Sequence, residues 1–295
     1  MNVLTQYKSK HQIIPGIKMK LEKVSDRVYA NCEGETGGNV GIVIMDDSVA
    51  AIDAQYPVSG ADFRASIKNY MDKPVTHLLL THVHGDHVLG NQAFEDCTIV
   101  SHRRLKERMK RSLADEWAPG NLEKMLEDYR KNRPERAYLF EGLRIVLPTE
   151  TIEDKYALPG LEMTHLPGHT DCSSIVYIPE DRVCFAGDLM FAKMFPWAGD
   201  PTANPDHWIK AFKKLLQMDV ETYVPGHGPL CGKEEFEIQL AWFEAARDKM
   251  RELIASGASE EEAIDRARYS ELYEDTGDRF ERSMRHWYKF YSKKS

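Results

Sequence analysis

The sequence has no long apolar run and little cysteine. Its unbroken apolar stretches are only a few residues long, as at 78–80, whereas a helix that crosses a bilayer needs about 20. The five cysteines are odd in number and lack paired spacing, so they do not describe a disulfide framework. The first ten residues are polar and lack the apolar segment of a signal peptide. We therefore expect a cytoplasmic protein with no membrane partner.

The chain also has no excess of positive charge. Its 47 acidic residues outnumber its 39 basic residues, which gives a formal net charge of −8. Proteins that bind duplex nucleic acid usually carry a basic patch, so we do not expect nucleic acid as a partner. The hydrophobic content of 42% over 295 residues suits a sizeable core and excludes disordered and fibrous classes.

Short runs rich in β-branched residues alternate with helical patterns, which indicates an α/β class. The predicted strands are 27–31, 39–45, 49–53, 75–81, 143–147, 161–166, 174–178, 183–186 and 222–224. Helical spacing predicts helices over 60–71 and 205–218, and within 103–134 with a break at Pro119. From 234 onward the chain reads as helical, with a stop at Gly257 and an N-cap at Ser259. Because we find no internal repeat and no linker, we expect residues 1–295 to form one domain.

The segment THVHGDH, residues 81–87, directly follows the apolar residues 75–80 of the predicted strand. Its three histidines and its aspartate are the ligand types that Zn²⁺, Mn²⁺ and Fe²⁺ accept, and Gly85 allows the backbone to turn between them. A solvated polar loop is the alternative interpretation. Four potential ligands within six positions favour a metal-binding loop instead.

Three later segments repeat one pattern, in which a strand leads through a glycine to a metal-ligand residue. They are LPGHT at 166–170, FAGD at 185–188 and VPGHG at 224–228. Each segment alone is a weak signal, because such sequences also occur in ordinary loops. Together with the loop at 81–87 they predict one metal site.

On these residues, HVHGDH at 82–87 followed by His169, Asp188 and His227, the sequence resembles the metallo-β-lactamase fold superfamily of hydrolases. The resemblance covers about residues 24–230 and implies a four-layer αββα sandwich with the site at one edge. The helices within 103–134 and a C-terminal helical extension over about 233–295 would be additions to this core.

The resemblance also implies two divalent metal ions, with Zn²⁺ favoured and Mn²⁺ or Fe²⁺ as alternatives. The implied ligands are His82, His84 and His169 for the first ion, and Asp86, His87 and His227 for the second, with Asp188 bridging the two. Asp53 matches a family aspartate that supports the metal loop, so we expect it to contact a ligand.

The implied activity is hydrolysis of a small-molecule carbonyl substrate, a thioester, lactone or β-lactam-like ring, by a hydroxide held between two metal ions. Asp86 is the candidate catalytic residue that orients this nucleophile. The commonest zinc β-lactamases carry Cys in place of Asp188 and Lys in place of Phe191, which makes β-lactams poor candidates here. The alternatives are a phosphodiesterase, a mononuclear iron enzyme of the persulfide dioxygenase kind, and a weak, promiscuous β-lactamase. A scaffold without activity would usually lack a ligand, and none is missing.

Four apolar residues close behind Asp188 are candidates for a substrate-binding wall, although some of them are expected to be core. They are Phe191, Met194, Phe195 and Trp197. The helices within 103–134 and those at the C-terminus are candidates for a lid or for a surface that forms a homo-oligomer. The aromatic and basic tail over 279–291 is expected to dock on the body or on another subunit rather than on a membrane.

Overall fold

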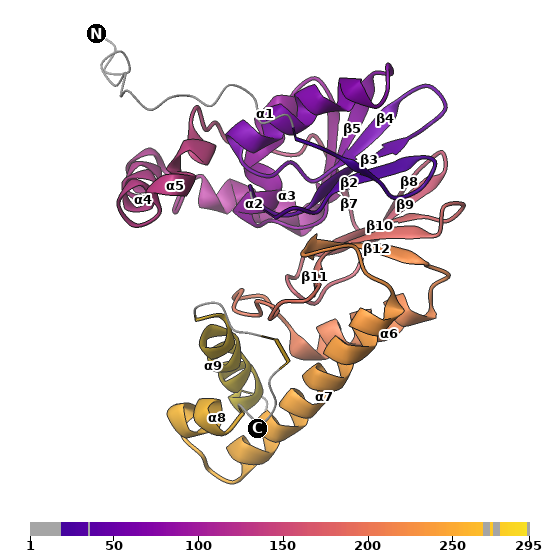
Figure 1. The fold of residues 1–295 in the computed structure, drawn as a ribbon. Helices are drawn as coiled ribbons and strands as arrows, with labels where there is room; N and C mark the ends of the chain where they lie inside the picture. The colour runs from indigo at the N-terminus through magenta and orange to yellow at the C-terminus, as the bar shows by residue number, and fades with distance from the viewer. Residues whose placement is uncertain (1–18, 35, 268–271, 274–277, 294–295) are drawn as a thin grey trace.

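Two β-sheets face each other in the computed structural model, which describes residues 19–34, 36–267, 272–273 and 278–293 (Figure 1). Within these residues, seven strands form one sheet in the order β1-β2-β3-β4-β5-β6-β7, and five form the other in the order β12-β11-β10-β9-β8. The first sheet consists of β1 (Glu22–Lys23), β2 (Val28–Asn31), β3 (Val40–Ile44), β4 (Val49–Ile52), β5 (Val75–Leu80), β6 (Thr98–His102) and β7 (Glu150–Ile152). The second consists of β8 (Lys155–Leu158), β9 (Leu161–His165), β10 (Ser174–Ile178), β11 (Val183–Phe191) and β12 (Thr222–His227).

Side-chain alternation along the strands explains how the layers stack. In β4, Ala50 and Ile52 join the hydrophobic cluster between the sheets, whereas Val49 and Ala51 face the helices outside. In β11, Phe185 points between the sheets and Cys184 points to the opposite face. Both faces of these strands are buried, which is why they read in the sequence as continuous apolar runs.

Helices cover the outer face of each sheet, so the predicted four-layer αββα sandwich is confirmed (Figure 1). The helices before the second sheet are α1 (Pro57–Ser66), α2 (Gly85–Val88), α3 (Arg103–Ser112), α4 (Pro119–Asn132) and α5 (Pro134–Ala137), with 3₁₀ turns η2 (Ile67–Asn69), η3 (Leu89–Phe94) and η4 (Tyr138–Phe140). The helices of the second half are α6 (Pro205–Gln217), α7 (Lys233–Ala255), α8 (Glu260–Ala267) and α9 (Arg279–Ser292). None of the helices in the described part of the chain has both the length and the apolar character needed to cross a membrane.

The strand predicted over 143–147 is wrong. These residues have no regular structure, and their half-buried apolar side chains pack against the cluster beneath α1 and α3. The strand at this edge is instead β7, which begins at Glu150 and pairs with β6. The sequence pattern also missed β6 and β8. In β8, exposed side chains alternate with half-buried ones, so its apolar signal is weak.

The C-terminal helices begin and end largely where the sequence predicts. Gly257 follows α7 with a φ of +80°. At the start of α8, the side chains of Ser259 and Glu262 each accept a hydrogen bond from the backbone N–H of the other residue. Pro119, predicted to break a helix, is the first residue of α4, a position that tolerates proline. The predictions for residues 1–10 and for helix over 268–271, 274–277 and 294–295 lie outside the described residues.

Candidate metal centre

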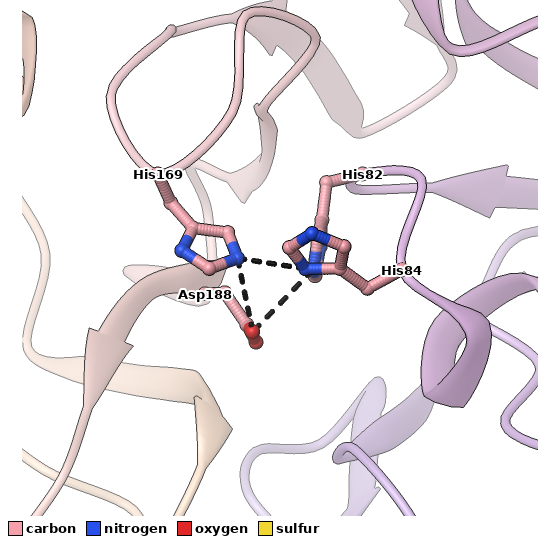
Figure 2. Close-up of side chains that lie close together, drawn as sticks. All are labelled: His82, His84, His169 and Asp188. Atoms are coloured by element: carbon pink, nitrogen blue, oxygen red, sulfur yellow. Dashed lines mark hydrogen bonds and ion pairs between the residues drawn. The ribbon is translucent and has the colours of Figure 1, made fainter. Parts of the chain in front are cut away.

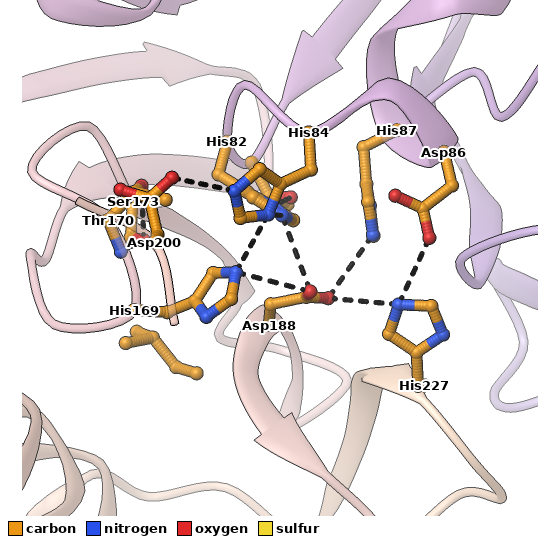
Figure 3. Close-up of polar contacts among 12 residues, drawn as sticks. His82, His84, Asp86, His87, His169, Thr170, Ser173, Asp188, Asp200 and His227 are labelled. Atoms are coloured by element: carbon orange, nitrogen blue, oxygen red, sulfur yellow. Dashed lines mark hydrogen bonds and ion pairs between the residues drawn. The ribbon is translucent and has the colours of Figure 1, made fainter. Parts of the chain in front are cut away.

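All seven predicted metal ligands lie together (Figure 3). The loop after β5 and the short helix α2 carry four of them, and His169 follows β9. His227 is the last residue of β12, whereas Asp188 lies inside β11 rather than after a strand. The pairing of β11 with β12 shifts register beside Gly187, whose φ is +52°. This irregularity provides the turn that the sequence pattern placed at a strand end.

Three imidazole nitrogens converge on one point (Figure 2). His84 Nδ1 lies 3.0 Å from His82 Nε2 and 2.9 Å from His169 Nε2. The ring planes stand nearly perpendicular to one another, at 83° to 90°. Asp188 Oδ2 approaches the same point, 3.4 Å from His82 Nε2 and 3.3 Å from His169 Nε2. Three imidazoles and a carboxylate oxygen suit a four-coordinate zinc-type ion.

The hydrogen bonds behind two of these rings fix which nitrogen carries the proton. Thr81 donates its hydroxyl proton to Asp53, so the Thr81 oxygen accepts a bond from His82 Nδ1 at 3.1 Å. His84 Nε2 donates to Asp200 at 2.8 Å. In neutral rings, the form that binds metal, the facing nitrogens His82 Nε2 and His84 Nδ1 would therefore both be unprotonated. Two lone pairs 3.0 Å apart repel each other unless a cation lies between them, so this arrangement fits a bound metal.

A second group of ligands faces the other oxygen of Asp188 (Figure 3). Asp188 Oδ1 lies 3.2 Å from His87 Nε2 and 3.5 Å from His227 Nε2, and Asp86 lies 3.3 Å from His227 Nε2. Among the described residues, neither His87 Nε2 nor Asp188 Oδ1 has a hydrogen-bond partner, although both are buried. Buried polar atoms are almost always satisfied, so these two fit a second metal position. One carboxylate thus presents one oxygen to each cluster.

Asp53 contacts both His87 and the backbone of Thr81. Its Oδ2 accepts from His87 Nδ1 at 2.8 Å, and its Oδ1 accepts from the backbone N–H of Thr81 at 2.8 Å. Asp53 adopts a φ of +56°, a left-handed conformation that is unusual for a residue other than glycine. Burial lowers the pKa of His87, but Asp188, Asp53 and Asp86 together raise it well above its ordinary value, so an ion bound at the outward-facing Nε2 would replace a proton.

Burial and charge together tune the centre. Burial lowers the pKa of His82 to about 4 and that of His169 well below its ordinary value, so both rings are neutral and able to bind metal. Burial raises the pKa of Asp188, but His227 and His87 lower it well below its ordinary value. The centre is open on one side, because the side chains of His84, Asp86 and His227 are 17–23% exposed.

Glycines allow the backbone to approach the ligands closely. A Cβ on Gly226 would lie 2.0 Å from Asp188 Oδ1, and one on Gly38 would lie 2.4 Å from the ring of His87. Neither distance leaves room for a side chain. Gly226 therefore leaves space for the carboxylate of Asp188 and also allows the turn before His227.

Sequence reasoning missed Asp200 and Arg108. Asp200 is buried and accepts from His84, while Arg108 donates to both of its carboxylate oxygens, at 2.8 and 3.2 Å. Burial raises the pKa of Asp200, but His84 and Arg108 lower it well below its ordinary value. No local motif marks either residue, since Arg108 lies on α3 and Asp200 lies in the loop before α6.

The four candidate wall residues occupy different surroundings. Trp197 is half-buried, with its ring centroid 5.1 Å from that of His84 and 5.9 Å from that of His169. Phe191 is buried and stacks on His227 at 5.2 Å, so it supports a ligand ring from behind. Phe195 instead packs in the core against Trp242, as part of the wall was expected to do. Met194 is half-buried against the same cluster.

Several curated proteins match this chain at low identity, among them the two described here. The chain is 24% identical over 250 residues to the 2,4-dinitroanisole O-demethylase subunit alpha of Nocardioides sp. (strain JS1661), covering 79% of this chain and 66% of that protein. It is 25% identical over 229 residues to a linear primary-alkylsulfatase of Pseudomonas sp. (strain ATCC 19151), covering 67% of this chain and 41% of that protein. The matched part is therefore less than two thirds of each relative's length.

Structural comparison and a family model agree on the fold. The stereoselective inverting sec-alkylsulfatase Pisa1 from Pseudomonas sp. matches 92% of this chain and 50% of its own, with a TM-score of 0.70 and 15% identity. The family model described as the metallo-beta-lactamase superfamily matches residues 34–227, which span the complete set of seven ligand-type residues. This chain belongs to the metallo-beta-lactamase superfamily.

Proposed function

We propose that this protein is a hydrolase with two divalent metal ions, Zn²⁺ in first place, that cleaves a neutral acyl substrate such as a thioester or lactone. Membership of a superfamily of hydrolases supports the general reaction. The proposal of two ions depends on one observation: the two carboxylate oxygens of Asp188 face two separate ligand clusters. His82, His84 and His169 would hold one ion, and Asp86, His87 and His227 the other.

The metal ions would supply an acidified water as the nucleophile and a Lewis acid for the carbonyl oxygen. The chain's own residues prepare the ligands for this work. Asp53 and Asp200 accept hydrogen bonds from the remote nitrogens of His87 and His84, which points the other nitrogen of each ring at the metal positions. Because both carboxylates are buried, they hold the two rings in a fixed orientation.

Asp86 is the proposed catalytic residue. Its side chain is 23% exposed, so it faces the open side of the centre. Burial raises its pKa, but His87 and His227 lower it well below its ordinary value, which keeps the carboxylate ionised. An ionised carboxylate at the opening accepts a hydrogen bond from an incoming water and orients it towards the substrate.

The surroundings of the opening favour an uncharged substrate group. Trp197 presents an aromatic surface beside His84. Phe191, which the family resemblance aligns with a cationic anchor of lactamases, is buried behind His227. An aromatic ring cannot donate the charge-assisted hydrogen bond that would hold a substrate carboxylate. Neutral acyl groups therefore fit this site better than a β-lactam does.

An alkyl sulfate ester is the second candidate substrate. A curated relative and a solved structure that matches 92% of this chain are both named as alkylsulfatases. The seven ligand-type residues leave this possibility open, because the same two-ion arrangement also serves reactions at anionic esters. A panel of substrates separates the two candidates.

The decisive experiment measures catalytic efficiency of the zinc-loaded protein on a neutral thioester, a neutral lactone, a cephalosporin, a phosphodiester and an alkyl sulfate. We expect the thioester or lactone to exceed the others by about tenfold or more, the scale of one lost charge-assisted bond. A tenfold advantage for the alkyl sulfate, phosphodiester or cephalosporin would move the assignment to that class. Activity with one iron equivalent on a persulfide would replace hydrolysis by the dioxygenase alternative.

We also propose that the core over about 24–230 and the helices after residue 233 form one domain. Side chains of β11, α6, α7, α8 and α9 share one hydrophobic cluster, which supports this organisation. The cytoplasmic location and the homo-oligomer stay predictions.

A further inference from the structure

We infer that α9 is a positioning element for the active-site loop, the segment 192–204 that joins β11 to α6. Arg279, Ser283 and His286 are the residues that act on this loop. The matched family region ends at residue 227, so α9 lies outside it. This inference rests on the proposed function only where turnover is measured.

The active-site loop carries two residues that contact the metal centre. Trp197 lies beside the rings of His84 and His169, and Asp200 accepts the remote proton of His84. Residues 192–204 contain neither helix nor strand, so the loop's polar backbone groups need partners from elsewhere. The position of Trp197 and Asp200 depends on where those partners lie.

One stripe of α9 supplies such partners. Ser283, which is buried, accepts from the backbone N–H of Ala198 at 2.9 Å. Arg279 donates to the carbonyl of Phe195 at 3.3 Å, and His286 Nε2 donates to the carbonyl of Ala203 at 2.8 Å. These three residues are four and three positions apart, so they follow one another along a single helix face.

The neighbouring stripe of α9 explains why the helix can hold this position. Phe280, Met284, Trp287 and Tyr291 are all buried in the cluster shared with β11, α6 and α7. The first three directly follow the three polar residues in sequence, and Tyr291 lies one helical turn after Trp287. Because the two stripes are adjacent on the helix, burial of the apolar stripe turns the polar stripe towards the loop. The docked helix is thus a fixed support.

Arg108 of α3 holds Asp200 near the end of the loop, and other elements hold its start. Gln239 of α7 donates to the carbonyl of Phe191 at 2.6 Å, and Glu235 of α7 accepts from the backbone N–H of Lys193 at 3.2 Å and pairs with its ammonium group at 2.8 Å. The middle of the loop, which carries Trp197, depends on Arg279 and Ser283. Loss of these bonds would lower the fraction of molecules in which the loop is correctly placed, and apparent affinity falls with that fraction.

The test compares Ser283→Ala and His286→Ala with Arg285→Gln, in the full chain. Arg285 lies on the same helix but pairs with Glu260 and Glu281, so its replacement perturbs α9 without removing a bond to the loop. We expect Ser283→Ala to raise KM and the metal dissociation constant about five- to tenfold, the equivalent of one hydrogen bond, with kcat nearly unchanged. Hydrogen exchange of the peptide over 192–204 should accelerate, and Ser283→Thr and His286→Gln, which retain a polar partner, should restore most of the effect.

The control decides the outcome. If Ser283→Ala and His286→Ala match Arg285→Gln in loop exchange, metal affinity and KM, α9 does not position the loop and the inference is wrong. Faster exchange with unchanged metal affinity and KM would also overturn it, because the bonds would then be purely structural. Loop exchange and metal affinity are measured without substrate, so they test α9 even if the proposed substrate class fails. His286 is half-buried, so its variants keep the test available if Ser283→Ala does not fold.

Discussion

Replacing Asp200 by asparagine should weaken metal binding without removing any metal ligand. Asp200 accepts from His84 Nε2 at 2.8 Å and receives two bonds from Arg108. The substitution keeps the size of the side chain and removes its charge. His84 then loses the ionic partner that fixes its orientation and increases the basicity of Nδ1.

The expected magnitude follows from this bond. A hydrogen bond to a charged group contributes about 1.5–3 kcal/mol, which corresponds to about 10- to 150-fold in a dissociation constant. Losses of metal affinity on replacing such a partner are typically about 10- to 100-fold. Asp200 is 2% exposed, so water does not readily replace the lost contact. We therefore expect the dissociation constant of the three-histidine site to rise about 10- to 100-fold.

Competition with a chromophoric chelator measures this change for Zn²⁺ at each site. Asp171→Asn is the matched control, because its carboxylate pairs with Arg104 and Arg108 rather than with a histidine. The control should bind metal within about threefold of the natural protein, well below the loss expected for a ligand's partner. An Asp200→Asn protein with unchanged affinity at the three-histidine site would refute the role that we give to this carboxylate.

Three further predictions address the bridge, the packing and the pH dependence of folding. Asp188→Ala should reduce the second metal equivalent and lower kcat more than it raises KM, and turnover within a few-fold of the natural protein would exclude the bridging role. Gly226→Ala places a Cβ 2.0 Å from Asp188 Oδ1, so it should lose metal and unfold at lower denaturant than Gly120→Ala, where the structure is open. Burial, His165 and Arg104 lower the pKa of His102 to about 4, below its ordinary value of 6.5, so this residue's contribution to stability should be lost as pH falls from 6.5 towards 4. His102→Asn keeps a cap for α3, and it should reduce the loss of unfolding free energy between these pH values by about 1–3 kcal/mol. Denaturant titrations at each pH measure this loss. If the variant shows the same pH dependence as the natural protein, His102 is not its source.

The ligand-type residues could be predicted because each lies in a short motif next to a strand. The loop at 82–87 contains four of them, and a glycine precedes each of the others. The strand pattern likewise reports burial on both faces, which fits β3, β4 and β11. The same pattern does not show whether a buried apolar segment pairs with a neighbouring strand. The segment 143–147 is apolar because it packs against the core, although it does not itself form a strand.

The partners of the ligands could not be predicted in the same way. Arg108 and Asp200 are 92 positions apart, and only the packing of α3 beside the loop before α6 brings them together. The choice between Phe195 and Trp197 as the aromatic residue at the site depends on a turn. Lys193 adopts a φ of +59°, so the regular alternation of β11 does not continue into the loop. Such backbone turns depend on tertiary contacts, here with Glu235, rather than on local residue pattern.

The distribution of the ligand residues between the two sheets has a consequence for measurements of stability. Four of these residues follow β5 of the seven-stranded sheet, while His169, Asp188 and His227 belong to or follow strands of the five-stranded sheet. Metal held by both groups would act as a cross-link that exists only in the folded state. A ligand that binds only that state adds about 4 kcal/mol at a thousand times its dissociation constant. The melting temperature of this protein would then report the free metal concentration of the buffer as much as the strength of its core.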